Sequence, residues 1–267
     1  MANRYGASDH TFALCAYGES SYLEECLTSL LSQTVQSNVI IATSTPNDCI
    51  RRLAGKYGVP LYENDGESGI SHDWNCAVSH CVTPLVTIAH QDDIYLPDYV
   101  ERTLEAFNSS SCPLISFTDY GELRGGRTAD SNRLLKVKRI LLAPLKLNVF
   151  KSSRFVRRRI LSLGSSICCP SVTFCVDSLP TPLFLSDMKC DLDWEAWERF
   201  SKLKGDFLYI PNILMRHRIH EESETTALIE DNTRSKEDLI MLEKFWPEFV
   251  ARFLNGCYAA SQNSNNV

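Results

Sequence analysis

The stretch Pro84-Leu85-Val86-Thr87-Ile88-Ala89-His90-Gln91-Asp92-Asp93 decides the fold of this chain. An apolar run leads into a short polar segment that ends in two adjacent carboxylates. Such a run is typical of a buried strand, and open α/β sheets bind ligands just beyond the carboxyl ends of their strands. Adjacent carboxylates repel each other unless a cation or hydrogen-bond donors offset their charge, and Asp oxygens suit Mg²⁺ or Mn²⁺. The stretch therefore indicates either a solvated turn or a metal site.

Strand and helix patterns alternate on both sides of this stretch. We predict strands over 11–17, 39–43, 59–62, 84–89 and 113–117, and helices over 21–33, 47–57, 70–81 and 95–107. Ser21 and Glu24 have the spacing of a capping box, and Gly58 ends the second helix. The alternation predicts an α/β fold with a mostly parallel, doubly wound central sheet flanked by helices. Because the chain lacks G-x-G-x-x-G after its first strand and the P-loop motif, an ordinary dinucleotide fold and a P-loop fold are excluded.

The pattern changes after residue 124. We predict short helices over 133–159 joined at Pro144, a strand over 170–176, a helix that starts near Asp193, strands over 207–210 and 213–219, a helix over 233–254 interrupted near Pro247, and a frayed tail over 261–267. Alternation along 213–219 places His217 on one face of the strand and Arg216, Arg218 and His220 on the other. We therefore divide the chain into 1–124, 125–232 and 233–267.

The charge of the chain is unevenly distributed. Its 267 residues carry a net charge of -6, which argues against a nucleic-acid partner. The segment 133–159 has no acidic residue and ten basic ones: Arg133, Lys136, Lys138, Arg139, Lys146, Lys151, Arg154, Arg157, Arg158 and Arg159. The remainder has 17 basic against 33 acidic residues. Three interpretations of the segment stay open: a solvated surface, a contact with a phosphorylated acceptor, and a contact with the anionic inner face of a membrane.

The cysteines and the apolar runs indicate a cellular compartment. The eleven cysteines are odd in number, lack paired C-x₂-C spacing, and follow a polar N-terminus with no signal peptide. We expect reduced cysteines that act as small core residues in a cytoplasmic protein. No apolar run approaches the length that a membrane span needs.

Three other groups have both a structural and a functional interpretation. Asp191-Leu192-Asp193-Trp194 is either a helix cap or the source of a general base. Arg216-His217-Arg218-Ile219-His220-Glu221-Glu222-Ser223-Glu224-Thr225 is either an ordinary strand end or a cationic site for a nucleotide diphosphate. Asp65-Gly66-Glu67-Ser68-Gly69 is either a turn or a close approach for a phosphate or sugar at a helix N-terminus.

The order of these motifs resembles the family 2 glycosyltransferases, which have the GT-A fold and transfer a sugar from a nucleotide diphosphate with inversion. The resemblance extends from about residue 12 to 225. It rests on Asn64-Asp65-Gly66, Asp73-Trp74-Asn75, His90-Gln91-Asp92-Asp93-Ile94-Tyr95, Asp191-Leu192-Asp193-Trp194-Glu195-Ala196-Trp197 and Arg218-Ile219-His220-Glu221-Glu222-Ser223-Glu224-Thr225. No single motif is decisive. The resemblance rests on the order of several motifs and on the length of the chain.

The resemblance implies a role for each matching residue. Asp93 would bind a divalent metal, Mn²⁺ or Mg²⁺, with His220 as a further metal or diphosphate ligand, and Asp193 would be the catalytic base. The implied donor-binding residues are Thr43, Thr45, Asn64, Asp65, Gly66, Asn75, Asp92 and Arg218. Residues 1–124 would bind the nucleotide-diphosphate sugar, and 125–232 would carry the base and the acceptor side of the same domain. The implied activity is sugar transfer to a glycan or lipid-linked acceptor in cell-surface polysaccharide biosynthesis.

Some residues depart from the family pattern. Many members carry an Asp after the second strand, where this chain has Thr43-Ser44-Thr45-Pro46, so the nucleotide base stays open. Asp73 and Trp74 stand where an Arg is frequent, and His90 stands where another acid is frequent. Two alternatives remain. A nucleotidyltransferase would need a glycine-rich basic loop after the first strand, and a catalytically silent relative would lack the metal acid or the base.

Overall fold

The computed structural model describes residues 4–66, 69–185, 188–220 and 233–263. Its first half alternates strands and helices: β1 (His10–Cys15), α1 (Leu23–Leu31), β2 (Asn38–Thr43), α2 (Asp48–Tyr57), β3 (Leu61–Glu63), α3 (Ile70–Ser79) and β4 (Leu85–His90). The predicted alternation is therefore confirmed. Asn47 caps α2 through its side chain, and Gly58 ends that helix in the left-handed conformation.

The second half has longer strands and more helices. It contains β5 (Ile94–Tyr95), α4 (Tyr99–Asn108), β6 (Pro113–Arg124), β7 (Arg127–Ala129), α5 (Arg133–Leu142), α6 (Arg154–Leu161), β8 (Val172–Cys175), α7 (Leu192–Ser201), β9 (Asp206–Ile219), α9 (Thr233–Glu243) and α10 (Glu248–Asn263). A 3₁₀ turn at Ala143–Lys146 joins the helices of the basic segment, as predicted at Pro144. Among the described residues, no helix combines the length and the apolar character needed to cross a membrane.

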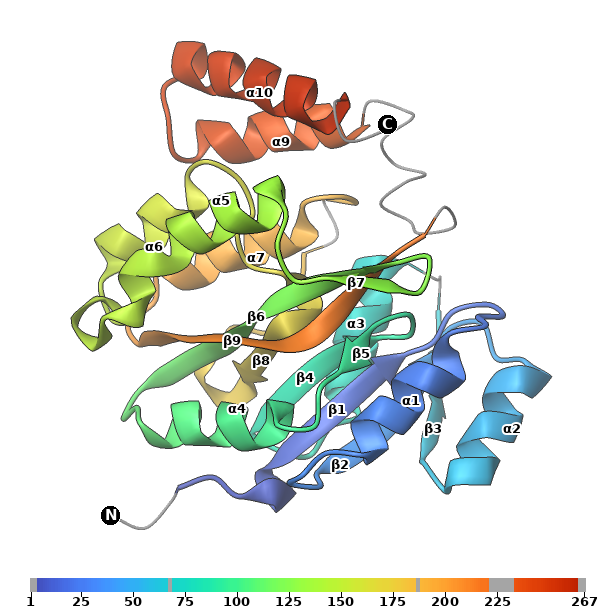
Figure 1. Ribbon diagram of the computed structural model, residues 1–267. Coiled ribbons are helices and arrows are strands. Elements are labelled where there is room, and N and C mark those ends of the chain that lie inside the picture. The colour runs from blue at the N-terminus through green and yellow to red at the C-terminus, as the bar shows by residue number, and fades with distance from the viewer. Residues whose placement is uncertain (1–3, 67–68, 186–187, 221–232, 264–267) are drawn as a thin grey trace.

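A mixed sheet of nine strands forms the centre of the molecule, in the order β3-β2-β1-β4-β8-β6-β9-β5, with β7 paired to β6 (Figure 1). The strands from β3 to β4 are parallel, as predicted. The predicted fifth strand, β6, does not lie beside β4, because β8 enters antiparallel between them. β6 and β9 are again parallel to each other. The prediction of a GT-A-like α/β fold is confirmed, and the sheet is mixed. The expectation that the strands after β4 simply continue the parallel order is wrong.

Several predicted boundaries were wrong, because contacts with other parts of the chain set them. The helix predicted over 95–107 begins only at Tyr99, because Ile94–Tyr95 forms β5 and pairs with β9. The strands predicted over 207–210 and 213–219 are one strand, β9, whose pairing with β6 is irregular between them. The predicted capping box fails, since Glu24 binds Lys56 and Tyr57 instead.

The C-terminal boundary also differs from the prediction. The predicted break at Pro247 is confirmed, because α9 ends at Glu243 and α10 begins at Glu248. Residues 261–263 belong to α10 and not to a frayed tail, whereas 264–267 lie outside the described residues.

Two apolar clusters hold the layers of the fold together. Phe12, Tyr95 and Tyr99 belong to the cluster that α1 and α4 cover. The second cluster contains Trp194 and Trp197 of α7, together with apolar residues of α6, α9 and α10. Full burial of each large side chain contributes about 1.5–3 kcal/mol. The two clusters therefore pack these helices against the central sheet.

A buried carboxylate attaches the C-terminal helices to the start of α7. Glu237 of α9 accepts hydrogen bonds from the backbone N–H groups of Lys189, Cys190 and Asp191, at 2.7 to 3.1 Å. The side chain is only 8% exposed. Because these donors precede the helix that carries Asp193, Glu237 fixes the position of the proposed base from a distant part of the chain.

Replacing Glu237 should therefore destabilise the protein. Glu237→Ala leaves three backbone donors without their acceptor, and we expect a loss of about 2 kcal/mol in the free energy of unfolding. Urea titration followed by circular dichroism measures this loss. Glu237→Gln keeps one acceptor oxygen and should lose less. An alanine variant as stable as the wild type would contradict the capping role.

Candidate active site

Asp93, just past the end of β4, is fully buried and only partly satisfied. Its Oδ1 accepts hydrogen bonds from Nδ1 of His217 at 3.0 Å and from the backbone N–H of Arg218 at 2.9 Å. Its Oδ2 is buried and has no hydrogen-bond partner. A buried carboxylate oxygen without a donor is costly, so a cation is the chemical partner that this atom fits.

The charge of Asp93 also acts on His217. Burial lowers the pKa of this imidazole, but the adjacent carboxylate outweighs burial and raises its pKa overall. The proton that His217 shares with Asp93 is therefore held more tightly than on a free imidazole. This contact fixes Asp93 Oδ1 and leaves only Oδ2 available to a ligand.

Asp92 lies against the other face of β9. Its Oδ2 accepts a hydrogen bond from Nε2 of His220 at 2.9 Å, and its carbonyl oxygen accepts from Nε of Arg218 at 2.7 Å. The guanidinium of Arg218 also binds Glu25 of α1 and stacks over the ring of Tyr22 at 4.2 Å. The structure thus brings the predicted residues Asp92, Arg218 and His220 together, and it places Arg218 where it ties α1 to β9.

Strand alternation explains why the two acids have different partners. Successive side chains of a strand point to opposite faces, so His217 meets Asp93, whereas Arg218 and His220 meet Asp92. The two faces were predicted correctly, but His217 was not recognised as a site residue. The missing signal is the pairing of Ile94 with Arg216, which sets the register of β5 on β9 and is not visible in the local pattern.

Side chains tie together the loops that follow β1, β2 and β4. The side-chain amide of Gln91 forms two hydrogen bonds with the backbone of Tyr17, at 2.9 and 3.0 Å. Oγ1 of Thr45 accepts from the backbone N–H of Gly18 at 2.7 Å, and buried Thr43 accepts from the backbone N–H of Thr45. The ring of Tyr17 stays 56% exposed. The predicted donor residues Thr43 and Thr45 therefore shape the loops at this edge of the sheet.

A second polar group lies at the ends of β2 and β3. Asp73 of α3 accepts hydrogen bonds from Ser44 at 2.9 Å, from Asn64 at 3.1 Å and from the backbone N–H of Gly69 at 3.3 Å. Oδ1 of Asn64 is buried and has no hydrogen-bond partner. Asp73 thus supplies a carboxylate beside the end of β2 from a helix and not from the strand itself.

The neighbouring loop is held by α3. The imidazole of His72 contacts the backbone carbonyl of Asp65 at 2.8 Å, and Gly66 adopts φ +96°, which favours glycine. The side-chain amide of Asn75 binds both the backbone N–H and the carbonyl of Phe184, at 3.1 and 2.8 Å. Asn75 therefore anchors the segment around Phe184, and its donor-binding role stays a prediction.

Asp193 stands in the first turn of α7 and is half-buried. Its Oδ1 accepts from the backbone N–H of Trp194 at 2.6 Å. Burial raises the pKa of this carboxyl, although that N–H group and Lys138 act in the opposite direction. A carboxylate with a raised pKa is a stronger base than an exposed aspartate, as general-base chemistry requires.

The thiol of half-buried Cys168 is influenced by the charges of both the proposed base and the proposed metal acid. Burial raises the pKa of Cys168, Lys138 lowers it, and the charges of Asp93 and Asp193 raise it further. Both carboxylates are therefore within electrostatic reach of one side chain. Lys138 donates to the hydroxyl of Tyr120 at 3.0 Å, and the Tyr120 ring lies 6.3 Å from that of His217. Lys138 belongs to this cluster and was not predicted as a site residue.

The remaining cation of the predicted site is bound elsewhere. Arg216 forms an ion pair with Asp130, beyond the β6–β7 hairpin. The sequence placed it on the same face as Arg218 and His220, but its guanidinium is directed to this acid. The cations at the site are therefore Arg218 and Lys138, beside the imidazoles of His217 and His220.

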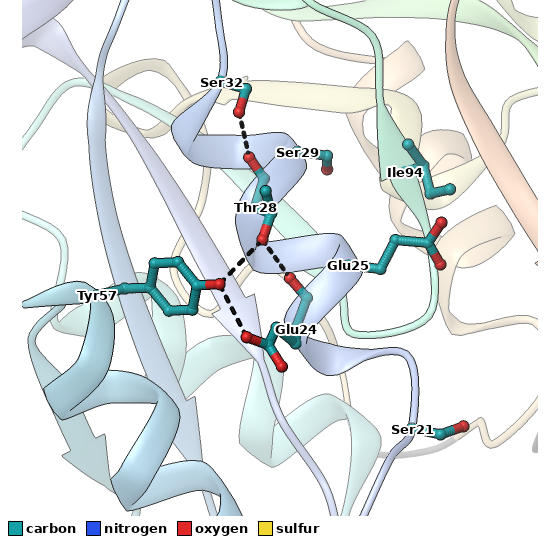
Figure 2. A pocket seen from close by; sticks show the side chains of 8 residues that line it. All are labelled: Ser21, Glu24, Glu25, Thr28, Ser29, Ser32, Tyr57 and Ile94. Atoms are coloured by element: carbon teal, nitrogen blue, oxygen red, sulfur yellow. Dashed lines mark hydrogen bonds between the residues drawn. The ribbon is translucent and has the colours of Figure 1, made fainter.

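An open cavity of about 620 Å³ lies along α1 (Figure 2). Its lining residues are Ser21, Glu24, Glu25, Thr28, Ser29, Ser32, Tyr57 and Ile94. Glu25 and Ile94 also border the site, because Glu25 binds Arg218 and Ile94 follows Asp93. None of the predicted donor, metal or base residues lines this cavity within the described part of the chain, so it is separate from the candidate site.

No group of three His, Cys, Asp or Glu side chains within the described ranges is arranged to hold a metal ion. A metal at Asp93 Oδ2 would therefore need its further ligands from substrate or water. Mg²⁺ is commonly bound in this way, through one or two carboxylates and substrate phosphates. Of the proposed metal pair Asp93 and His220, the imidazole of His220 binds Asp92 through Nε2.

The mixed α/β fold, with its central sheet covered by helices, matches that of solved GT-A glycosyltransferases. The mannosyltransferase PcManGT from Pyrobaculum calidifontis, in complex with GDP-Man and Mn²⁺, is similar at TM-score 0.62 and 14% identity, covering 99% of this chain and 77% of that chain. TarS from S. aureus in complex with UDP-GlcNAc is similar at TM-score 0.58 and 12% identity, covering 92% and 70%.

A third solved structure is glucosyl-3-phosphoglycerate synthase from Mycobacterium tuberculosis in complex with Mn²⁺ and UDP-Glc. It has TM-score 0.56 and 14% identity, and covers 90% of this chain and 79% of that chain. No curated protein sequence matches the chain significantly. The family described as "Glycosyl transferase family 2" matches residues 11–171, which is more than half of the chain. The chain belongs to this family, and the protein is a glycosyltransferase.

Proposed function

We propose that the protein is a metal-dependent, inverting glycosyltransferase that uses a nucleotide-diphosphate sugar. The observation that carries this proposal is the buried Oδ2 of Asp93, which has no partner and lies at the ligand-binding edge of the sheet. Two of the structurally similar glycosyltransferases hold Mn²⁺ with a nucleotide sugar, which supports the same chemistry here.

The residues around Asp93 would hold the donor. Asp93 Oδ2 would bind Mn²⁺ or Mg²⁺, which when bound neutralises the diphosphate leaving group. Asp92, oriented by His220 and Arg218, would contact the ribose or share the metal. His220 remains a proposed metal or diphosphate ligand, and to reach either it would exchange its bond with Asp92. The loops of Thr45, Asn64 and Asp65 would surround the nucleoside.

Asp193 would act on the acceptor. Its carboxylate removes the proton from the acceptor hydroxyl as the oxygen attacks the anomeric carbon of the donor. The bond from that carbon to the diphosphate oxygen breaks on the opposite face, so one displacement inverts the configuration, as in inverting glycosidases. The proton stays on Asp193 until solvent removes it.

The two parts of the chain would divide this work. Residues 1–124 would bind the donor, and 125–232 would supply the base and the acceptor side of the same domain, followed by the C-terminal region 233–267. The acceptor would be a glycan or a lipid-linked glycan in cell-surface polysaccharide biosynthesis. We place the enzyme in the cytoplasm, with the basic segment 133–159 directed to the acceptor or to the inner face of the membrane.

Removing the proposed metal acid should abolish metal-dependent donor binding. In Asp93→Asn the amide keeps the shape of the side chain but removes its charge, so Mn²⁺ should no longer couple to nucleotide. The readout is the melting temperature with UDP-, GDP-, TDP- and CMP-sugars, with and without Mn²⁺, since a donor that binds the native fold raises it. Asp98→Asn, at an exposed acid nearby, is the matched control. A Mn²⁺-dependent shift that survives in Asp93→Asn would refute the metal role.

Removing the proposed base should affect turnover and spare donor binding. We expect Asp193→Asn to lower kcat by a factor on the order of 10²–10⁴, as is typical of acid–base groups, with unchanged donor affinity. Initial rates and titration of the donor measure the two quantities. Asp191→Asn, two residues upstream, should keep turnover. If Asp193→Asn turns over normally, the base is another residue.

The pH dependence of kcat should also report Asp193. The base must be ionised, so activity falls as pH decreases through its pKa. Because burial raises that pKa above the ordinary 3.8, the acid limb should lie at a higher pH than for an exposed aspartate. A pH–rate profile at saturating donor shows the limb. If the same acid limb persists in the residual activity of Asp193→Asn, the group that titrates is not Asp193.

A further inference from the structure

The ten basic residues of segment 133–159 divide into two sets. Five of them contact protein groups: Lys138, Arg139, Lys151, Arg157 and Arg158. Arg157 is fully buried and donates to the carbonyl oxygens of Leu203 and Gly205 at 2.8 Å. These side chains are directed to the rest of the fold, so they are not presented to a partner that approaches α5 and α6 from outside.

The other five basic side chains are exposed. They are Arg133, Lys136, Lys146, Arg154 and Arg159, and none of them forms an ion pair with an acid of the described ranges. The guanidinium of Arg159 also lies over the rings of Phe155 and Trp246. Large apolar side chains are exposed between the five basic ones, namely Val137, Ile140, Leu147, Val149 and Phe155. Ile140 is 71%, Val149 74% and Phe155 72% exposed. We call these ten residues the basic–apolar face.

The spacing on α5 places its members on one side of the helix. Arg133, Lys136, Val137 and Ile140 are separated by three or four residues, so they form one stripe. Leu135, Leu142 and the side chains that bind the fold lie on the opposite side. α6 directs Arg154, Phe155 and Arg159 outward. Figure 1 shows α5 and α6 beside each other at the end of the molecule away from α2 and β3, and their residues are in contact.

This combination restricts what can cover the face. Exposed apolar side chains are stabilised by an apolar partner, and clustered cations without acids are stabilised by an anionic one. A soluble phosphorylated glycan supplies anions but leaves the apolar side chains in water. The surface of an anionic bilayer supplies both, because its headgroups are charged and the acyl boundary below them is apolar.

We propose that the basic–apolar face docks on a membrane surface that contains anionic lipids. The docking is independent of the transferase activity, whereas its purpose, access to a lipid-linked acceptor, rests on the proposed function. The opposite side of α5 carries Lys138, which binds Tyr120 next to His217. One helix therefore contacts both the lipid surface and the neighbourhood of the active site.

Vesicle binding by the full chain tests the proposal. We expect co-sedimentation with vesicles of phosphatidylcholine and phosphatidylserine, and none with phosphatidylcholine alone. Each basic residue near an anionic surface contributes about fivefold to partitioning, so Lys136→Glu with Arg154→Glu should weaken binding by at least about 25-fold. Both substitutions place an acid in the first turn of a helix, which the helix dipole favours, so folding should be kept.

The matched control has the same change in net charge at a distance from the face. Arg4→Glu with Arg52→Glu changes exposed residues of the N-terminal stretch and of α2. It should bind vesicles like the wild type and share its circular dichroism spectrum. Equal binding of the two double variants, or no binding of the wild type to anionic vesicles, would overturn the proposal. Neither result bears on catalysis, which is measured separately with Asp93→Asn and Asp193→Asn.

A separate experiment tests the contribution of the apolar side chains and the alternative that the basic–apolar face binds a phosphorylated acceptor. At about 1 M salt, charges are screened over about 3 Å, so the remaining vesicle binding reports the apolar contacts. Ile140→Ser with Val149→Ser should remove this remainder. If Lys136→Glu with Arg154→Glu instead keeps vesicle binding and raises KM for a soluble phosphorylated acceptor, the face binds acceptor and the membrane proposal is wrong.

Discussion

The contact on which the rest of the site depends is the one between Asp93 and the last residues of β9. A buried carboxylate is tolerated only when donors or a cation offset its charge. His217 and the backbone N–H of Arg218 supply two donors to one oxygen, from a strand more than a hundred residues later. The end of β4 is thereby joined to the end of β9, and the second oxygen is left for a ligand.

The first half of the fold could be predicted because each element carries a local signal. β1, β2 and β4 are apolar runs, and Asn47 and Gly58 mark the two ends of α2. β5 escaped prediction because Ile94 and Tyr95 are too few to form a pattern, and they are a strand only through β9. The position of β8 between β4 and β6 escaped as well, since the order of strands depends on long-range packing that no local window contains.

The sequence predicted the residues of the candidate site better than it predicted the contacts between them. Asp92, Arg218 and His220 lie together as expected, because the acids end one strand and the cations end another. The proximity of His217 to Asp93 required the register between β5 and β9. Asn75 was expected at the donor and is found on the backbone of Phe184. A motif identifies polar side chains but not whether the ligand or the chain itself uses them.

Much of the polar chemistry at this edge of the sheet fixes backbone before any ligand arrives. Gln91 holds the Tyr17 loop, Thr45 holds Gly18, and Asp73 holds Ser44 and Asn64. A site whose loops are already ordered loses less conformational entropy when it binds. Donor affinity can then come from a few new contacts, and the exposed ring of Tyr17 is available to make one.

The attachment of Arg218 has a consequence for how this sequence can change. Its guanidinium reaches Glu25 on α1, Tyr22 just before α1 and the backbone of Asp92, so separate segments share one side chain. A substitution at Arg218 leaves Glu25 without its cation and the Asp92 loop without its donor at the same time, and the effects are not additive. Substitutions at Glu25 and Arg218 are therefore expected to occur together. Related sequences should differ from this one at both positions or at neither.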